Sequence, residues 1–280
     1  MPTSSGRTVL ITGCSSGIGK ATAARLAKSG WDVWATARRP ETLAELTGCR
    51  PLALDVTDEA SMQAAVDTVL AESGRIDALV NNAGYSLSGA VETLSVAEIR
   101  REFETNVFGL IRLTQLVLPS MRDQRGGRIV NIGSMGGKLT FPGGGAYHAS
   151  KYAVEAFSDA LRYEVSGFGV QVVLIEPGLI TTNFEDAALA TMDTESESPY
   201  KVFNRAVAKA TSDAYGGPMA KLGGPPEAVA KVIERVLTKR RPKPRYTVTP
   251  SAPASIGMRH VLGDRGWDLA MRSQFPRPGR

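Results

Sequence analysis

Three side chains in the middle of the sequence have types and spacings that suit proton transfer. Ser134 lies 13 residues before Tyr147, and Lys151 follows that tyrosine by four residues. Helical residues four apart lie on one face, so a helix here places the phenol and the ammonium side by side. Lowering a tyrosine pKa from about 10 to about 7 requires about 4 kcal/mol of phenolate stabilisation, towards which a nearby ammonium contributes. The trio predicts a tyrosine acid or base with Ser134 holding a substrate oxygen; the alternative is a tyrosine at a helix start and a solvent-facing lysine.

A glycine-rich turn near the start of the sequence has the composition of a phosphate-binding loop. The apolar run 8–12 leads into Gly-Cys-Ser-Ser-Gly-Ile-Gly and then directly into a helical pattern. Glycines let a backbone approach a pyrophosphate closely, and the first turn of a helix offers free amide protons to the anion. The spacing by itself also fits an ordinary strand-turn-helix corner. The candidate pyrophosphate residues are Gly13, Ser15, Ser16, Gly17, Ile18 and Gly19.

The end of the expected second strand carries two arginines and no acid. Dinucleotide folds that select NAD usually place a carboxylate here for the ribose hydroxyls, whereas this chain has Arg38 and Arg39. A guanidinium binds a phosphate monoester through two parallel charged hydrogen bonds. The sequence therefore favours NADP over NAD as the cofactor. The alternative is a solvated pair of arginines at the end of a strand.

Two further strand ends carry residues that suit the same ligand. Asp55 and Val56 follow the third expected strand, where a carboxylate can bind the adenine amino group; the alternative is an acid in a turn. Asn82, Ala83 and Gly84 follow the fourth, where small residues let a cofactor lie against the backbone; the alternative is again a tight turn. Both segments are therefore candidate cofactor contacts.

Short apolar strands that alternate with amphipathic helices must position these residues. The strands are expected at 8–12, 32–37, 51–55, 76–80, 128–132, 170–175 and 246–248, and the longest helix at 146–168. Such apolar strands are typical of a parallel sheet covered on both faces, and right-handed crossovers give a doubly wound sheet. The predicted fold class is α/β: a Rossmann-like doubly wound parallel sheet in three layers, forming a single domain.

The length of 280 residues fits one large α/β domain. We expect a dinucleotide-binding catalytic domain over 1–250. The pattern weakens within it over about 179–224, which predicts a substrate-binding loop or lid. The Arg-rich and poorly periodic segment 251–280 is expected to be a docked C-terminal extension.

Composition narrows the classes of function. The 33 basic and 28 acidic residues give a net charge of +5, which favours solubility over a nucleic-acid partner. No apolar run approaches the roughly 18 residues of a membrane span, and no secretory signal is visible at the start. The 2 cysteines fit a reducing compartment, and the 2 histidines lack metal-ligand spacing. We therefore expect a cytoplasmic protein without a bound metal, a nucleic-acid partner or a membrane span.

Together and in this order, these motifs resemble the short-chain dehydrogenase/reductase family over about residues 7–250, and a segment of the long helix is similar to its steroid and retinol dehydrogenase branch. The resemblance implies that Ser134, Tyr147 and Lys151 are catalytic, with the lysine also gripping the ribose hydroxyls of the cofactor. It implies that Asn106 holds the water of a proton relay. It further implies that a P-G-x-x-x-T element contacts the nicotinamide; the candidate residues there are Pro177, Gly178, Ile180 and Thr182.

One position departs from that family's pattern. Many NADP-preferring members carry a basic residue just before the middle glycine of the first turn, where this chain has Ser16. The prediction of NADP therefore depends on Arg38, with Arg39 in support. NAD is the less favoured cofactor.

The predicted function is an NADP-dependent oxidoreductase that transfers a hydride between the nicotinamide and a hydrophobic ketone or secondary alcohol. The alternative is a non-catalytic, NADP-responsive regulatory protein, against which the intact trio argues. The resemblance also implies a homo-dimer or homo-tetramer. The candidate substrate residues are mostly apolar: Met135, Phe141, Leu179 and Phe184, accompanied by Tyr85, Leu87, Leu139, Leu189 and Met192.

Overall fold

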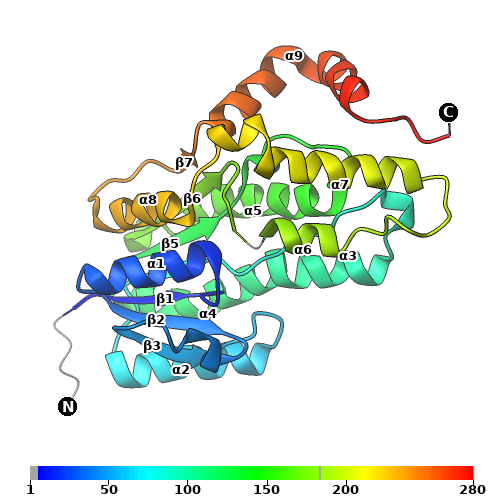
Figure 1. The fold of residues 1–280 in the computed structure, drawn as a ribbon. Coiled ribbons are helices and arrows are strands. Elements are labelled where there is room, and N and C mark those ends of the chain that lie inside the picture. Colours follow the sequence, from blue (N-terminus) through cyan, green and yellow to red (C-terminus); the bar gives the residue numbers. More distant parts are fainter. Residues whose placement is uncertain (1–5, 183, 280) are drawn as a thin grey trace.

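The computed structural model describes residues 6–182 and 184–279 and contains a seven-stranded parallel sheet (Figure 1). The spatial order of the strands is β3-β2-β1-β4-β5-β6-β7. From β1 the chain winds first towards β3 and then, from β4, in the opposite direction, which makes the sheet doubly wound. The strands are β1 (Thr8–Ile11), β2 (Asp32–Ala37), β3 (Cys49–Ala53), β4 (Ala78–Asn81), β5 (Gly127–Ile132), β6 (Val170–Pro177) and β7 (Arg245–Val248).

Helices cover both faces of this sheet and its carboxyl edge (Figure 1). None of the helices in the described part of the chain is long and apolar enough to cross a membrane. The helices are α1 (Gly17–Lys28), α2 (Glu59–Ser73), α3 (Val96–Phe103), α4 (Gly109–Asp123), α5 (Gly145–Glu164), α6 (Phe184–Ala190), α7 (Lys201–Gly216), α8 (Pro226–Thr238) and α9 (Ser251–Gln274).

The two faces of β1 show why the strands read as continuous apolar runs. Val9 and Ile11 are fully buried in the cluster that contains α1 and α8. Leu10, between them, is equally buried in the cluster that contains α2 and α4. Successive strand residues point to opposite faces, so a strand covered on both sides is apolar at most of its positions. The predicted three-layer, Rossmann-like fold is confirmed.

Local capping fixes where α2 and α3 begin. The Asp58 carboxylate accepts from the amides of Ala60 and Ser61 at 2.9 and 3.2 Å. Ser95 and Glu98 form a reciprocal capping box at the start of α3. Such bonds satisfy amides that have no partner within the helix, and each contributes about 1 kcal/mol.

The weakly patterned segment 179–224 contains two helices, α6 and α7, instead of an open loop. Within α7, the buried Asn204 side chain accepts from the Ala90 amide at 3.2 Å and donates to the Asp193 carbonyl at 2.9 Å. The two helices contact each other more than they contact the sheet. In α7 only Asn204 and Val207 are buried, so the helix offers few core positions for a sequence pattern to reveal.

The C-terminal extension is also helical, as α9, and it is docked on the domain. Trp267 is buried, and its indole nitrogen donates to the Thr140 carbonyl at 3.0 Å. Its neighbours are Leu139 and Met271. The backbone of Gly263 has φ +59°, and this kink breaks the helical periodicity that a sequence reading depends on.

Gly109, where α4 begins, is expected to tolerate no larger residue. A Cβ there would overlap the carbonyl oxygen of Val56 and lie 2.9 Å from its Cβ. We expect Gly109→Ala to lower the free energy of unfolding by about 1–3 kcal/mol, because the backbones must separate. Urea denaturation measures this. Gly257→Ala in α9, where a Cβ meets nothing within 4 Å, is the matched control and should leave stability unchanged or raise it by up to about 1 kcal/mol; equal effects of the two substitutions would contradict the expectation.

Candidate active site

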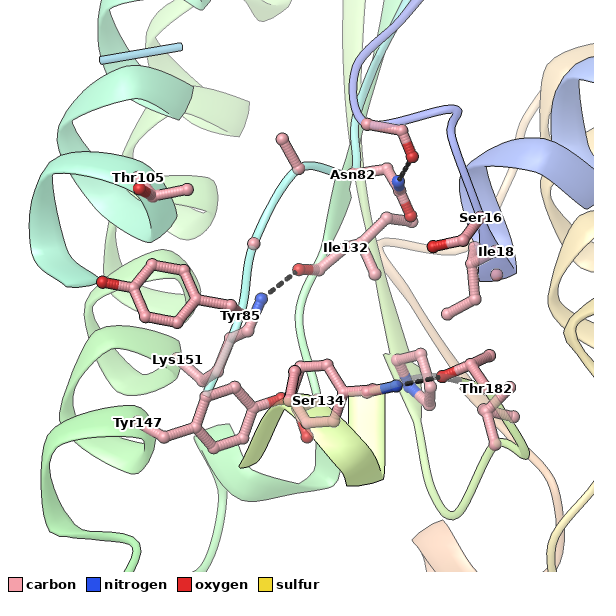
Figure 2. Close-up of a pocket in the computed structure, with 18 of the residues that line it drawn as sticks. Ser16, Ile18, Asn82, Tyr85, Thr105, Ile132, Ser134, Tyr147, Lys151 and Thr182 are labelled. Atoms are coloured by element: carbon pink, nitrogen blue, oxygen red, sulfur yellow. Dashed lines mark hydrogen bonds between the residues drawn. The ribbon is translucent and has the colours of Figure 1, made fainter. Parts of the chain in front are cut away.

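A cavity of about 510 Å³ lies at the carboxyl edge of the sheet (Figure 2). It lies where the strand order reverses between β1 and β4, which is the usual ligand position in such sheets. Of the predicted site residues, Gly19, Arg39 and Asn106 are not in its lining. Those that line it are Gly13, Ser15, Ser16, Gly17, Ile18, Arg38, Asp55, Val56, Asn82, Ala83, Gly84, Ser134, Met135, Phe141, Tyr147, Lys151, Pro177, Gly178, Leu179, Ile180, Thr182 and Phe184.

The glycine turn between β1 and α1 forms one wall of this cavity. Gly13 and Gly17 have φ of +70° and +55°, a region in which other residues are strained. The Asn82 amide holds the turn by donating to the carbonyls of Thr12 and Gly13 at 2.9 and 3.1 Å. A Cβ on Gly17 would lie 3.2 Å from the side chain of Thr182 on the opposite wall. The glycines therefore keep a narrow passage open.

The first turn of α1 faces the cavity without a competing side chain. Its N-cap, Ser16, makes no side-chain hydrogen bond to the helix, and the first turn contains no acidic residue. Gly19 lies inside the helix, where a Cβ would overlap the carbonyl oxygen of Gly13. Its role is therefore close packing of the turn, while the free amides of the helix start suit an anion.

The two arginines after β2 lie differently with respect to the cavity. Both are exposed, but only Arg38 is among the lining residues. Asp55 lines the cavity as well, and its Oδ1 accepts from the amide and the hydroxyl of Thr57 at 2.9 and 2.8 Å. Asp55 therefore stabilises the turn after β3, as the alternative interpretation predicts, and it also lies where it could contact a ligand.

The predicted trio comes together at the base of the cavity (Figure 2). Ser134 follows β5, while Tyr147 and Lys151 lie in the first two turns of α5. The phenol is hydrogen-bonded to Ser134, whose Oγ also accepts from the Gly136 amide at 3.0 Å. The ammonium lies 5.8 Å from the centre of the tyrosine ring and donates to the Ile132 carbonyl at 2.9 Å.

Burial shifts the pKa values of both ionisable groups of the trio. It raises the pKa of Tyr147 above its ordinary range, although the hydrogen bond from Ser134 acts in the opposite direction. It lowers the pKa of Lys151 to about 8, although the charge of Glu102 opposes this shift. In the protein alone, desolvation of the phenolate therefore outweighs the lowering that the sequence predicts from Lys151. A further positive charge beside the phenol would act against burial.

Asn106 does not line the cavity but holds in place the segment after β4, which does. It lies in a π-helical turn, Glu104–Phe108, between α3 and α4. Its side chain accepts from the Tyr85 amide at 3.0 Å and donates to the Tyr85 carbonyl at 2.8 Å and to the Ser150 hydroxyl at 3.1 Å. The residue thus ties the segment after β4 to α5. Its predicted water-holding role stays a prediction.

Part of the cavity lining is apolar. Met135, Phe141, Leu179 and Phe184 belong to it, and the Phe184 ring lies 5.4 Å from that of Tyr147. Of the other predicted substrate residues, Tyr85 also lines the cavity. The remaining four do not: Leu87, Leu139, Leu189 and Met192.

Sequence reasoning missed Tyr215 and Ala187, which line the cavity from α7 and α6. The charge of Tyr215 influences the pKa of Tyr147. No motif marks these residues, since they reach the site only through the packing of the two helices.

His148 has a structural role at the rim. Its Nδ1 lies 2.9 Å from the Gly136 carbonyl, and its Nε2 accepts from the Phe141 amide at 3.2 Å. Across residues 6–182 and 184–279, no cluster of histidine, cysteine, aspartate and glutamate has the arrangement of a metal site.

The chain's own geometry accommodates a nicotinamide dinucleotide. A side chain at Gly17 would fill the passage beside α1, and the amides of that helix start are available for a pyrophosphate. Arg38 lies among the lining residues, as do Thr182 and Lys151. The residues that would hold such a group therefore surround one continuous cavity.

Comparison with known proteins agrees with this geometry. The family model described as short chain dehydrogenase matches residues 7–193. The chain is 43% identical to the 3-ketodihydrosphingosine reductase of Bacteroides thetaiotaomicron over 178 residues, 64% of this chain and 65% of that protein. It is 37% identical to the oxidoreductase YbbO of Escherichia coli over 95% of this chain and 94% of that one.

A solved structure is similar over most of the chain. The closed form of serine dehydrogenase complexed with NADP⁺ has a TM-score of 0.75 and 31% identity, covering 87% of this chain and 94% of that chain. The shared fold, the family match and the cofactor of this relative support a nicotinamide cofactor for this protein. The chain therefore belongs to the short-chain dehydrogenase family and is an NAD(P)-dependent oxidoreductase.

Proposed function

We propose that this protein is an NADPH-dependent reductase of hydrophobic ketones that works through Ser134, Tyr147 and Lys151. One observation carries the proposal. The phenol of Tyr147 is hydrogen-bonded to Ser134 in a cavity whose lining also includes the glycine turn and the apolar side chains of Phe141 and Phe184. A carbonyl oxygen placed between the two hydroxyl groups would accept a hydrogen bond from each.

The side chains of the trio have distinct tasks in this reaction. When bound, NADPH supplies the hydride that adds to the carbonyl carbon. Ser134 donates a hydrogen bond that orients the carbonyl oxygen, and Tyr147 transfers its phenolic proton to that oxygen. Lys151, held by the Ile132 carbonyl at 2.9 Å, stabilises the resulting phenolate by its charge and would also hold the ribose hydroxyls. The reverse steps oxidise a secondary alcohol.

A relay restores the tyrosine proton in this proposal. Asn106 would hold a water that connects Lys151 to solvent. Supporting this, a Cβ built on Gly84 would lie 3.0 Å from the Asn106 Oδ1 and 3.8 Å from the Lys151 Nζ, so both atoms flank the same backbone position.

Arg38 is the basis for NADP over NAD. Its guanidinium is exposed beside the cavity and forms no ion pair with another described residue. A guanidinium free of carboxylates can bind the 2′-phosphate, and a reduced NADP pool favours carbonyl reduction.

The substrate is proposed to be a lipid-like or otherwise apolar ketone. Support comes from the apolar part of the cavity lining, which includes Met135, Phe141, Leu179 and Phe184. The Bacteroides relative is named as a reductase of 3-ketodihydrosphingosine. The same class is the first to test here.

A panel of ketones and alcohols of increasing chain length, assayed with NADPH and NADH in parallel, tests the proposal. We expect turnover with NADPH to rise with apolar chain length and to be much slower with NADH. NADPH binding without oxidation by any carbonyl compound would instead favour the non-catalytic regulatory protein. A strong preference for NADH would refute the role of Arg38 alone.

We also propose a homo-dimer or homo-tetramer. Aromatic side chains are exposed on and beside α5, including Tyr152, Phe157 and Tyr163, whose exposed fractions are 44%, 47% and 86%. Such a face is suited to contact with a second copy.

A further inference from the structure

A buried carboxylate that the proposed chemistry does not use lies behind the trio. Glu102, on α3, is fully buried, with an exposed fraction of 0%. One carboxylate oxygen accepts from the Leu87 amide at 3.1 Å and from the Asn106 amide group at 3.4 Å. The other oxygen is buried and has no hydrogen-bond partner among the described residues. An ionised carboxylate in this position is costly unless a positive charge is near.

A short chain of contacts connects Glu102 to Lys151, the cation of the proposed catalytic trio. Asn106 is one helical turn after Glu102, and its amide also bonds to Ser150, next to Lys151 in the sequence. Asn106 and the Lys151 ammonium approach the same side of Gly84. The Asn106 amide therefore lies between the Glu102 carboxylate and the Lys151 ammonium.

The charges of Glu102 and Lys151 stabilise each other. Burial lowers the pKa of Lys151 to about 8, and the Glu102 charge is the cause that opposes this shift. Burial raises the pKa of Glu102 to about 7, and Lys151 opposes that shift together with the Leu87 amide. The groups in direct contact with the ammonium are neutral: it donates to the Ile132 carbonyl at 2.9 Å and lies 5.8 Å from the centre of the Tyr147 ring.

We propose that Glu102 is a positioning residue that supplies the negative charge by which the buried Lys151 stays an ammonium ion. Its effect on the reaction rests on the proposed function, because the ammonium acts there through Tyr147. The effect on Lys151 itself does not depend on any substrate.

Besides Lys151, the Glu102 charge acts on two phenols. It raises the pKa of Tyr147, on α5, and that of Tyr85, in the segment after β4. On its own helix, Arg101 and Glu98 act on Tyr85 in opposite directions. Glu102 therefore opposes phenolate formation while it supports the ammonium.

The sign of the pH effect follows from these pKa values. Below about pH 7 Glu102 is neutral, so Glu102→Gln should match the parent at pH 6. Above that pH the parent gains the carboxylate and the variant does not. The pKa of Lys151 should then be about one unit lower in the variant, and the ammonium fraction at pH 8.5 about eightfold smaller. The alkaline limb of kcat/KM for ketone reduction should move to lower pH by a similar amount.

The test is a titration of Lys151 by NMR on the full chain labelled with ¹³Cε-lysine, with the signal assigned through Lys151→Arg. We expect the midpoint to fall by about one pH unit in Glu102→Gln. Glu104→Gln, on an exposed residue two positions later, is the matched control and should leave it unchanged. Glu102→Asp, which keeps the charge, should stay close to the parent.

An unchanged Lys151 midpoint in Glu102→Gln would overturn the proposal, as would an equal fall in the Glu104→Gln control. If Glu102→Gln does not fold, Glu102→Asp and Glu102→Asn give the same comparison of charged and neutral side chains. If the parent reduces no ketone, the proposed function fails, whereas the NMR titration still decides whether Glu102 controls the charge of Lys151.

Discussion

Replacing Tyr147 by phenylalanine is expected to lower kcat for ketone reduction by about 10²–10⁴-fold, the usual contribution of a general acid. The substitution removes one oxygen and keeps the ring, which packs edge-on against Phe184 at 5.4 Å between centres. The fold and the cofactor passage should therefore persist. NADPH affinity, followed by the fluorescence of the reduced cofactor, should change by less than about threefold, since less than 1 kcal/mol of binding is at stake.

A neighbouring tyrosine provides the control for this experiment. Tyr152 lies in the same helix with 44% of its surface exposed, and it does not line the cavity. Tyr152→Phe should leave kcat unchanged. Turnover of Tyr147→Phe within tenfold of the parent would show that another group supplies the proton and would remove the basis of the proposed mechanism.

The second large effect is expected at the adenosine end of the cavity. Arg38→Ala removes the guanidinium that we propose for the 2′-phosphate, a charge-assisted contact of about 1.5–3 kcal/mol. The ratio of kcat/KM with NADPH to kcat/KM with NADH should therefore fall by about 10–150-fold. Values with NADH should change little, because that cofactor has no phosphate at this position.

Arg39→Ala is the control that distinguishes the role of Arg38 from that of its neighbour. Arg39 is exposed and is not among the lining residues, so its removal should change the cofactor ratio by less than about threefold. An equal fall in kcat/KM with NADPH and with NADH in Arg38→Ala would contradict the proposed binding of the 2′-phosphate. It would indicate that Arg38 instead maintains the structure of the site.

The parts of the fold that could be predicted from the sequence are those that local physics determines. The strands were recognisable because both faces of residues such as Val9 and Leu10 must be buried. The glycine turn was recognisable because φ values of +70° and +55° at Gly13 and Gly17 exclude most other residues. The Tyr147 and Lys151 pair was recognisable because a helix brings residues four apart together.

Other features depend on packing that no local pattern encodes. Glu102 lies among charged residues of α3, two of them arginines, so its sequence reads as a solvated face. The packing of α3 against the segment after β4 and against α5 buries it. Tyr215 reaches the cavity because α7 lies across the carboxyl edge. The pKa of Tyr147 depends equally on enclosure, which spacing does not reveal.

The docking of Trp267 joins the last helix to the mouth of the substrate end. Its indole nitrogen bonds to the Thr140 carbonyl at 3.0 Å, and its ring lies 5.6 Å from that of Phe141. Phe141 in turn forms part of the cavity wall. Repacking the part of α9 around Trp267 would consequently reshape the cavity wall at Phe141. Displacing the beginning of α9 would reach further, because the Ser251 hydroxyl accepts from the Leu179 amide at 2.9 Å, next to the proposed nicotinamide contact Gly178. The end of this helix therefore bears on substrate selectivity, whereas its beginning is joined to the proposed cofactor site.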